Sequence, residues 1–443
     1  MHAAVNDKMK VVVGLGKTGL SCARFLASRN EEFRVVDTRP NPPGLNQLKA
    51  ECPDIEPELG DFNEETLMNA SQLIVSPGVD QQTPALRKAI ENGVPVTGDV
   101  DIFAREVDAP FIAITGSNAK STVTTLVGAM AKAQGLDVTV AGNIGLPVLD
   151  ALQQQPASLY VLELSSFQLE TTTDLGAEVA TVLNLCLDHM DRYDSVEAYR
   201  DAKHRIFQGC RQVVINDDDP MSNGSFSDDV QQWHFGLSGQ ETSEFTVIED
   251  SLAFNGATLI PVSDLRIPGT HNVANALAAL ALGHAAGFSM QAMVDTLKTF
   301  EGLPHRCQWV AEKDGIHWYN DSKGTNVGAC VAAINGLGGK GKIILLAGGQ
   351  GKGADFSGLK ESLSTFARLA ILFGEDAQPI EEAIKQSVMT VRVSSMQEAV
   401  SLADEKADAG DIVLLSPACA SFDMFKNFEE RGDAFMKCVR ELH

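Results

Sequence analysis

Short apolar runs alternate with amphipathic stretches along most of this 443-residue chain, and glycine-rich turns join many of them. Near the start, a strand at Lys10–Val13 runs into glycine-rich residues 14–19, a helical stretch follows, and a second strand comes at Phe33–Asp37. A strand, a glycine turn, a helix and a strand in this order form a βαβ unit, which requires a parallel sheet. The pattern restarts with a strand at Phe111–Thr115 and again after residue 303, so we expect an α/β protein.

The length predicts about three domains, because a typical domain has roughly 100 to 200 residues. The alternation breaks near residue 98 and at a Gly-Leu-Pro turn, residues 302–304, and no short-period repeat is visible. We expect domains at residues 1–98, 99–303 and 304–443. The first and third are expected to be Rossmann-like, and the second to be built around an ATP-binding P-loop.

The charge balance limits the partners, since 59 acidic and 35 basic residues give a net charge of −24 at pH 7. Such a surface repels nucleic acids and anionic membranes, so neither is expected as a partner. The apolar runs fall far short of the roughly 20 residues that cross a bilayer, and the N-terminus lacks the apolar stretch of a secretory signal. We expect a cytoplasmic protein whose eight scattered cysteines are reduced and form no C-x-x-C motif.

Gly14, Gly16 and Gly19 form a G-x-G-x-x-G segment between a strand and a helix. Glycines there allow close approach of the backbone, and the helix N-terminus offers N–H groups to a phosphate. Asp37, at the end of the second strand, lies where a ribose-binding acid is expected. The motif favours a nucleotide diphosphate site over a mere tight turn, but it does not distinguish a dinucleotide from a UDP-sugar.

The segment Gly116-Ser-Asn-Ala-Lys-Ser-Thr122 carries the most chemical information. A small-residue loop between a strand and a helix supplies N–H groups for phosphates, a lysine for the β/γ oxygens and a hydroxyl for Mg²⁺. It departs from the general Walker pattern, because Ile114 and Ala119 occupy the two glycine positions. Alanine at positive φ would cost roughly 1–2 kcal/mol, so we expect Ala119 at negative φ.

Glu163 ends the buried strand that follows this loop. A carboxylate at the carboxyl end of a strand beside a P-loop is well placed for Mg²⁺, and the alternative is a solvated strand end. Taken alone, residues 188–192 are typical of a hydrogen-bonded loop and Lys203 of a surface lysine. Asn272 and Asn275 lie three apart on one helix face, where their amides either contact a base or ribose or cap the helix.

Three polar or glycine-rich loops follow strands of the third domain, at residues 320–326, 348–353 and 416–421. The carboxyl ends of neighbouring parallel strands meet at one crevice, which is where ligands of such sheets bind. Lys323 and Lys352 would allow an acidic protein to hold an anionic substrate there.

Taken together, these segments resemble the Mur ligase family of ATP-dependent, amide-forming enzymes of peptidoglycan synthesis, and within it the D-glutamate-adding branch. The resemblance covers essentially the whole chain. It rests on GLGKTGLSC, ITGSNAKSTVTT, AGNIG, LELSSFQLE, LNLCLDHMDRY, GTHNVANALAALAL, GLPHRCQWV, NDSKGTNVGA and SPACASFDMFKNFEERG. The Asp-Asn-Pro-Arg motif of the diaminopimelate-adding branch is absent, whereas Asp321-Ser-Lys323 is what the D-glutamate-adding branch shows.

The resemblance implies site residues for each ligand. Those expected around the UDP-N-acetylmuramoyl-L-alanine substrate are Lys17, Thr18, Asp37, Thr38, Arg39, Ser76, Gly78 and, from the second domain, Asn143. Those expected around ATP are Gly116, Ser117, Asn118, Ala119, Lys120, Ser121, Thr122, Asn272, Asn275, Arg306 and Asp321. Those expected around D-glutamate are Thr325, Lys352, Ser421 and Phe428. The expected ligands of two Mg²⁺ ions are Ser121, Glu163, His189 and a carbamylated Lys203.

The implied reaction has two steps: phosphorylation of the substrate carboxylate by ATP, then attack of the D-glutamate amine on the acyl phosphate. Lys120, His189 and Lys203 are the expected catalytic residues, and the base is either His189 or a substrate-bound water. The third domain is expected to close over the site, and the enzyme to be a monomer. The alternatives are another ligase of the family, of the folylpolyglutamate synthase type, a nicotinamide-dependent oxidoreductase, and a non-catalytic P-loop sensor.

Overall fold

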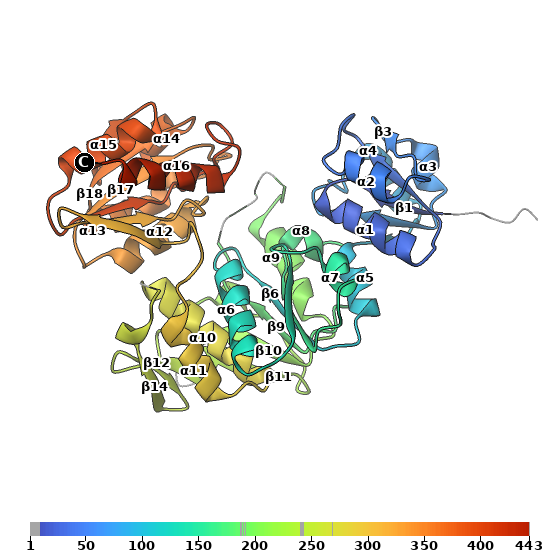
Figure 1. The fold of residues 1–443 in the computed structure, drawn as a ribbon, viewed down its shortest axis with the longest axis horizontal. Coiled ribbons are helices and arrows are strands. Elements are labelled where there is room, and N and C mark those ends of the chain that lie inside the picture. Colours follow the sequence, from blue (N-terminus) through green and yellow to red (C-terminus); the bar gives the residue numbers. More distant parts are fainter. Residues whose placement is uncertain are drawn as a thin grey trace, which may run out of the picture. The chain divides into compact units, whose positions relative to one another are not determined.

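The computed structural model describes residues 9–186, 188, 190, 192–239, 243–267 and 269–442. The chain separates into two compact units. One contains Met1–Leu185, Glu197–Phe235 and Ala278–Met293, and the other contains Cys186–Val196, Gly236–Leu277 and Val294–His443. Parallel strands covered by helices are the dominant feature of both units (Figure 1).

The first unit begins with a five-stranded parallel sheet in the order β3-β2-β1-β4-β5. Its strands are β1 (Lys10–Val13), β2 (Phe33–Asp37), β3 (Glu58–Leu59), β4 (Gln72–Val75) and β5 (Val96–Thr97). The connecting helices are α1 (Lys17–Ser28), α2 (Leu45–Glu51), α3 (Glu64–Met68) and α4 (Pro84–Glu91). Because β1 lies between β2 and β4, the turns after these three strands lie at one edge of the sheet.

A second parallel sheet completes this unit, with strands in the order β11-β10-β9-β6-β8-β7. The strands are β6 (Phe111–Thr115), β7 (Val138–Gly142), β8 (Leu159–Glu163), β9 (Val179–Val182), β10 (Gln212–Asn216) and β11 (Gln231–Phe235). The helices are α5 (Asp99–Glu106), α6 (Lys120–Ala133), α7 (Val148–Leu152), α8 (Ser166–Leu169), α9 (Val196–His204), η1 (Arg205–Phe207) and η2 (Pro220–Ser222). The central strand β6 is buried over its whole length and leads directly into the predicted P-loop.

The second unit contains an antiparallel meander and a six-stranded sheet. The meander consists of β12 (Phe245–Ile248), β13 (Ser251–Phe254) and β14 (Ala257–Pro261). It is followed by η3 (Val262–Asp264), α10 (Thr270–Ala285) and α11 (Met290–Thr299), of which Ala278–Met293 belongs to the first unit. The sheet has the order β15-β16-β20-β17-β18-β19, and only the β15–β16 pair is antiparallel. Its strands are β15 (Gln308–Lys313), β16 (Ile316–Asn320), β17 (Ile343–Gly348), β18 (Ala367–Phe373), β19 (Met389–Arg392) and β20 (Ile412–Leu415).

Helices cover both faces of this last sheet. They are α12 (Val327–Leu337), η4 (Phe356–Leu359), α13 (Lys360–Phe366), α14 (Ala377–Ile384), α15 (Met396–Lys406) and α16 (Phe428–Arg440). Ile343 and Leu345 pack on the face covered by α12 to α14, whereas Ile344 and Leu346 pack on the face covered by α15 and α16. This alternation explains why the strand is one continuous apolar run, as expected for a parallel sheet buried on both sides.

The predicted α/β class is confirmed, and the strands predicted at Lys10–Val13, Phe33–Asp37 and Phe111–Thr115 are β1, β2 and β6 with the same ends. Between η2 and α10, the described residues form the short strands β11 to β14 and the 3-10 turn η3. Within the described ranges, no helix has the length and apolar character needed to span a membrane. The predicted domain limits at residues 98 and 303 remain predictions.

Candidate active site

The loop between β6 and α6 has the geometry of a phosphate-binding turn. Gly116 has φ 155°, and a Cβ there would lie 3.1 Å from Leu183 Cβ, so the position accommodates glycine far better than any other residue. The loop is anchored to the β9 end, because Asn184 Oδ1 accepts a hydrogen bond from Asn118 N at 2.8 Å and Asn184 O accepts one from Ser117 N at 2.9 Å. Helix α6 then starts at Lys120, so its first N–H groups face the loop.

The expectation that Ala119 has negative φ is wrong. Ala119 has φ 66° and ψ −13°, the left-handed conformation, and it is the N-cap of α6 without a side-chain cap. The chain needs this conformation to pass from the loop into the helix in a single residue, which is why glycine is usual at this position. The protein therefore holds backbone strain of roughly 1–2 kcal/mol next to Lys120.

Lys120 folds back on its own loop in this structure. Its Nζ donates to Gly116 O at 2.7 Å and to Ser117 O at 2.9 Å. Ser121 and Thr122, in the first turn of α6, are both buried. The loop thus brings together one ammonium group, two hydroxyls and the N-terminus of a helix, which is a suitable set of groups for a polyphosphate.

Glu163 provides a carboxylate at the end of the strand beside β6, which leads into this loop. It is buried at the end of β8 and pairs in register with Ile114 of β6. Its Oε1 accepts a hydrogen bond from Asn143 Nδ2 at 2.7 Å, and Oε2 is buried with no hydrogen-bond partner in the described part of the chain. A buried carboxylate oxygen without a partner is costly unless a cation or a donor arrives, so this group suits Mg²⁺.

No group of three or more His, Cys, Asp or Glu side chains suited to a metal occurs within the described residues. This does not conflict with a Mg²⁺ site at Glu163, because Mg²⁺ beside a P-loop usually takes one or two protein ligands and completes its shell with phosphates and water. His189, also predicted as a metal ligand and catalytic residue, lies outside the described residues.

Lys203 is not the surface lysine that its local sequence suggests, because α9 buries it with only 1% of its surface exposed. Its Nζ donates to Gly116 O at 2.9 Å and to Thr115 Oγ1 at 3.3 Å, and lies 4.8 Å from the centre of the Tyr199 ring. The Tyr199 hydroxyl is in turn 3.1 Å from Ser117 Oγ. The structure therefore brings Lys203 to the same loop as Lys120, and its role as a carbamylated metal ligand remains a prediction.

The first domain gathers its predicted residues after β1, β2 and β4. Gly19 is required, because a Cβ there would lie 1.8 Å from Gly14 O. Asp37 accepts hydrogen bonds from Leu15 N at 2.6 Å, from Arg39 N at 2.8 Å and from the Arg39 guanidinium at 2.6 and 2.8 Å. Burial opposes ionisation, but these bonds outweigh it and hold the pKa of Asp37 below its ordinary value.

The remaining residues predicted for the UDP part lie in the turns after β1, β2 and β4. Ser76 Oγ donates to Gly14 O at 3.0 Å and so joins the loops after β4 and β1. The residues exposed beside them are Lys17, Thr38, Arg39 and Gly78, and Thr18 is half-buried. Asn143, expected to reach the same substrate, uses its amide N–H on Glu163, and its contact with a substrate remains a prediction.

In α10 the two predicted asparagines are buried and bonded to each other, with Asn275 Nδ2 donating to Asn272 Oδ1 at 3.0 Å. The helix already begins at Thr270, so Asn275 does not cap it. His271, beside them, is half-buried with its ring packed against Gly336, and desolvation of the ring lowers its pKa to about 4, so this imidazole is neutral.

Asp321 lies at the end of β16, buried with Ser416 and Cys307. Its Oδ2 accepts a hydrogen bond from Ser416 Oγ at 2.7 Å and its Oδ1 one from Cys307 N at 3.1 Å. Burial raises the pKa of Asp321 to about 6.

Arg306 is flanked by His305 and Cys307, which both have left-handed backbones, with φ 61° and φ 43°. A left-handed non-glycine residue on each side of one arginine strains the backbone, and such strain is common at functional sites.

The three loops predicted to form one crevice in the third domain do meet, since β16, β20 and β17 are neighbours in the sheet. Ala418 N donates to Gly324 O at 2.9 Å, and Gln350 and Ala420 pair through both backbone groups at 2.9 Å. Lys323 Nζ lies 3.9 Å from the centre of the Phe428 ring. Ser421 is buried, Thr325 and Phe428 are half-buried, and Lys352 is exposed.

Sequence reasoning did not single out Arg431, which lies in one of the segments that carry the family resemblance. It is fully buried in α16 and hydrogen-bonded to these loops. Nothing in its local sequence, a charged residue in a charged helical turn, distinguishes it from a solvated arginine.

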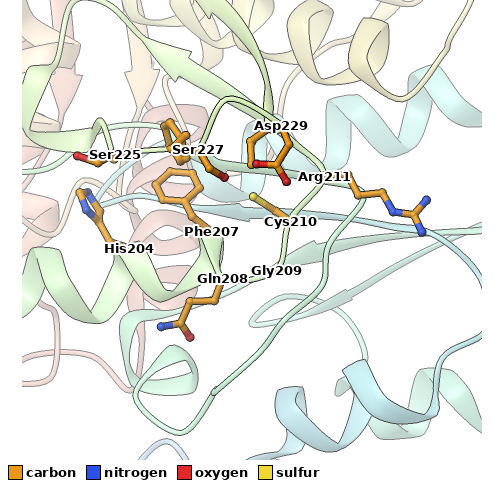
Figure 2. A pocket seen from close by; sticks show the side chains of 12 residues that line it. His204, Phe207, Gln208, Gly209, Cys210, Arg211, Ser225, Ser227 and Asp229 are labelled. Atoms are coloured by element: carbon orange, nitrogen blue, oxygen red, sulfur yellow. The ribbon is translucent and has the colours of Figure 1, made fainter.

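A cavity of about 820 Å³ lies between η1 and the segment before β11 (Figure 2). Phe207 and Phe226 meet edge to face in its wall with ring centres 5.0 Å apart, and His204, Cys210 and Asp229 also line it. It contains none of the predicted site residues, so it is not the predicted nucleotide site.

Family models match three successive segments of the chain. They are described as the Mur ligase MurD-like N-terminal domain at residues 8–98, the Mur ligase middle domain at 114–283, and the Mur ligase glutamate ligase domain at 305–419. The three segments together cover most of the chain.

Curated relatives match over the full length. UDP-N-acetylmuramoylalanine–D-glutamate ligase of Pseudomonas aeruginosa is 55% identical, and the enzyme of the same name from Marinobacter nauticus is 50% identical, each covering 100% of both chains. Among solved structures, a pseudomurein peptide ligase type C from Methanothermus fervidus matches with a TM-score of 0.62, 18% identity and coverage of 98% and 100%. UDP-N-acetylmuramate-alanine ligase from Thermotoga maritima matches with a TM-score of 0.60, 18% identity and coverage of 98% and 99%. The structural matches show a shared fold.

Proposed function

Because the chain belongs to the Mur ligase family, we propose that it joins D-glutamate to UDP-N-acetylmuramoyl-L-alanine while ATP is cleaved to ADP and phosphate. The observation that carries the assignment is the full-length identity of 50% to 55% with relatives named for that ligation. The enzyme therefore acts in peptidoglycan precursor synthesis. The MurD-like character of the first domain leaves the nicotinamide-dependent alternative without support.

The reaction needs ATP because a carboxylate is a poor acyl donor whose leaving group would be oxide. In the first step the L-alanyl carboxylate oxygen attacks the γ-phosphorus, the bond to ADP breaks and an acyl phosphate forms. In the second step the unprotonated amine of D-glutamate attacks the carbonyl carbon, and phosphate leaves with its electron pair. Two anions must meet in the first step, so catalysis depends mainly on positioning and on neutralising charge.

The β6–α6 loop is assigned to the phosphates of ATP. Lys120 now donates to two carbonyls of its own loop, and those bonds can be exchanged for bonds to the β/γ oxygens without moving the backbone. Arg306 is assigned to the γ-phosphoryl group, because the strained residues on either side of it fix the direction in which it leaves the loop. Asn272, Asn275 and Asp321 are assigned to the nucleotide.

Glu163 and Ser121 are assigned to Mg²⁺, which supplies charge neutralisation at the phosphates when bound. The unpartnered Oε2 of Glu163 is the support for this assignment, and the bond from Asn143 would fix the orientation of the carboxylate. We further assign Lys203 to a carbamate that shares a second Mg²⁺ with His189. Carbamylation would replace a cation with an anion at a buried position next to the phosphate loop.

The three loops at the carboxyl ends of β16, β17 and β20 are assigned to D-glutamate through Thr325, Lys352, Ser421 and Phe428. A dicarboxylate needs cations in a protein of net charge −24, and Lys323 and Lys352 are the lysines that these loops carry. The proposal includes a monomeric enzyme in the cytoplasm, which is the compartment that supplies ATP. The proton of the attacking amine passes to His189 or to a water bound with the substrate.

The test combines the protein with ATP, Mg²⁺ and UDP-N-acetylmuramoyl-L-alanine, and adds D-glutamate, L-glutamate, L-lysine or diaminopimelate in separate reactions. Mass spectrometry of the nucleotide product is expected to show an added glutamyl residue with D-glutamate, and phosphate release is expected to depend on both substrates. Equal incorporation of any other amino acid would overturn the substrate assignment. Phosphate release without an acceptor would favour the P-loop sensor.

A further inference from the structure

Helix α16 places a fully buried arginine beneath the third-domain loops. Asn427 caps the helix by accepting a hydrogen bond from Glu430 N at 2.8 Å, and Arg431 follows in the first turn with none of its surface exposed. Burial lowers its pKa to about 10, which leaves it positively charged at neutral pH. A buried charge is costly unless all its donors are satisfied, so its retention calls for an explanation.

The Arg431 side chain donates its hydrogen bonds to backbone and hydroxyl oxygens. Nε donates to Ser322 Oγ at 3.0 Å and Nη2 to Ser322 O at 2.8 Å. Nη1 donates to Cys419 O at 3.0 Å, to Ala420 O at 3.3 Å and to Gly348 O at 3.4 Å. Asp321 and Asp423 act on its charge only through longer-range attraction. The guanidinium therefore directs four of its five N–H groups to oxygens of the protein chain itself, and the side chain is fully buried beneath the loops.

The acceptors come from three loops that are far apart in the sequence. Ser322 follows β16, Gly348 ends β17, and Cys419 and Ala420 follow β20. Each loop carries groups assigned above to D-glutamate, a few residues from its bond to Arg431. These groups are Thr325 on the first loop, Lys352 on the second and Ser421 on the third. Arg431 is thus a single rigid group that fixes the distances between all three sets.

Arginine is suited to this position because its planar guanidinium presents five N–H donors in a fixed fork. A lysine ammonium has three donors at one point, and it would keep the charge without reaching all three loops. The approach is tight, since a Cβ on Gly349 would lie 2.1 Å from Ala420 O and 3.2 Å from Arg431 Nη1. The loops therefore fit around a guanidinium at this position.

We propose that Arg431 is a positioning residue for the acceptor amino acid, which sets the relative placement of the three loops that bind D-glutamate. The proposal rests on the function proposed above. Arg431 does not touch the substrate, and it acts through the loops that do. Its loss weakens D-glutamate binding far more than binding of the UDP-linked substrate, whose assigned residues are mostly in the first domain.

The test measures steady-state kinetics of Arg431→Lys and Arg431→Met with each substrate varied in turn. We expect the KM for D-glutamate to rise roughly 10- to 100-fold in both variants, because misplacing a binding group by about 1 Å has effects of that size. The KM for UDP-N-acetylmuramoyl-L-alanine is expected to stay within about twofold. An Arg431→Lys variant with the wild-type KM for D-glutamate would show that the charge alone suffices and would overturn the proposal.

Phe435→Leu is the matched control. Phe435 lies one turn further along α16, fully buried beside Trp318 in the core and away from the loops. We expect this variant to lower the melting temperature of the third domain and to leave the KM for D-glutamate unchanged. An equal rise in that KM would mean that destabilising α16 is enough, which also overturns the proposal. Failure of the wild-type protein to incorporate D-glutamate would instead refute the proposed function.

Discussion

Replacing Ala119 with glycine tests the strain at the phosphate loop. The left-handed backbone of Ala119 costs roughly 1–2 kcal/mol for a residue with a Cβ. Glycine removes this cost but adds about 0.5–1 kcal/mol of conformational freedom to the unfolded chain. We therefore expect Ala119→Gly to increase the free energy of unfolding by about 0.5–1 kcal/mol. Most glycine substitutions in or beside a helix have the opposite effect.

Urea unfolding followed by the fluorescence of Trp233 measures this change in the unit that holds the loop. Trp309 and Trp318, in the third domain, are replaced by phenylalanine in all the proteins compared, so that Trp233 is the only tryptophan left. The control is Ala129→Gly within α6, which should lose about 1 kcal/mol because helix interiors disfavour glycine. The KM for ATP is expected to stay within about twofold in Ala119→Gly, since the backbone already has the required conformation. An Ala119→Gly protein less stable than its parent would refute the reasoning.

Three further changes test the groups around the reaction. Glu163→Gln is expected to lower kcat at least about 100-fold at saturating ATP and Mg²⁺, because the metal loses a buried anionic ligand, as measured by phosphate release. Lys203→Ala is expected to lose activity and to recover part of it with a short-chain carboxylic acid, because the acid replaces the proposed carbamate; full activity without the acid would exclude that role. Asp321→Asn is expected to stabilise the third domain at pH 7 by up to about 3 kcal/mol and hardly at all at pH 4, as measured by urea unfolding at the two pH values.

The direction of the stability change in Asp321→Asn follows from the direction in which the pKa of Asp321 is shifted. Its pKa in the folded protein, about 6, lies above the ordinary value of 3.8, so the folded state binds the proton more tightly than the unfolded state does. The destabilisation is therefore absent below about pH 4, develops between pH 4 and 6, and is complete above that range. A stability difference between the wild type and Asp321→Asn that did not change with pH would contradict this account.

For Glu163→Gln, the control is a Mg²⁺ titration, since a purely structural defect would not change the metal requirement.

Local patterns in the sequence were sufficient to predict the architecture. Phe111–Thr115 was predicted with both ends correct, because a short apolar run before a glycine loop and a helix has few other structures available. The three third-domain loops were predicted to meet for a topological reason, since the carboxyl ends of adjacent parallel strands share one edge. Neither inference required knowledge of the packing between distant residues.

Properties that depend on tertiary contacts were not available from the sequence. The burial of Lys203 results from the packing of α9 against the β6 end, and an isolated helical segment gives no sign of it. The prediction of negative φ for Ala119 was wrong. The steric preference of alanine for negative φ is weaker than the requirement of the loop to start α6 at Lys120. Arg431 looks like a solvated helical arginine until the loops that surround it are placed.

The most direct test of the central claim follows oxygen atoms through the reaction. UDP-N-acetylmuramoyl-L-alanine is labelled with ¹⁸O at both carboxylate oxygens and converted with ATP and D-glutamate in unlabelled water. If ligation proceeds through an acyl phosphate, one ¹⁸O appears in the inorganic phosphate for each amide bond formed, and the other stays in the new amide. Phosphate that carries only unlabelled oxygen would show that water, not the substrate carboxylate, attacks ATP, and would contradict the account.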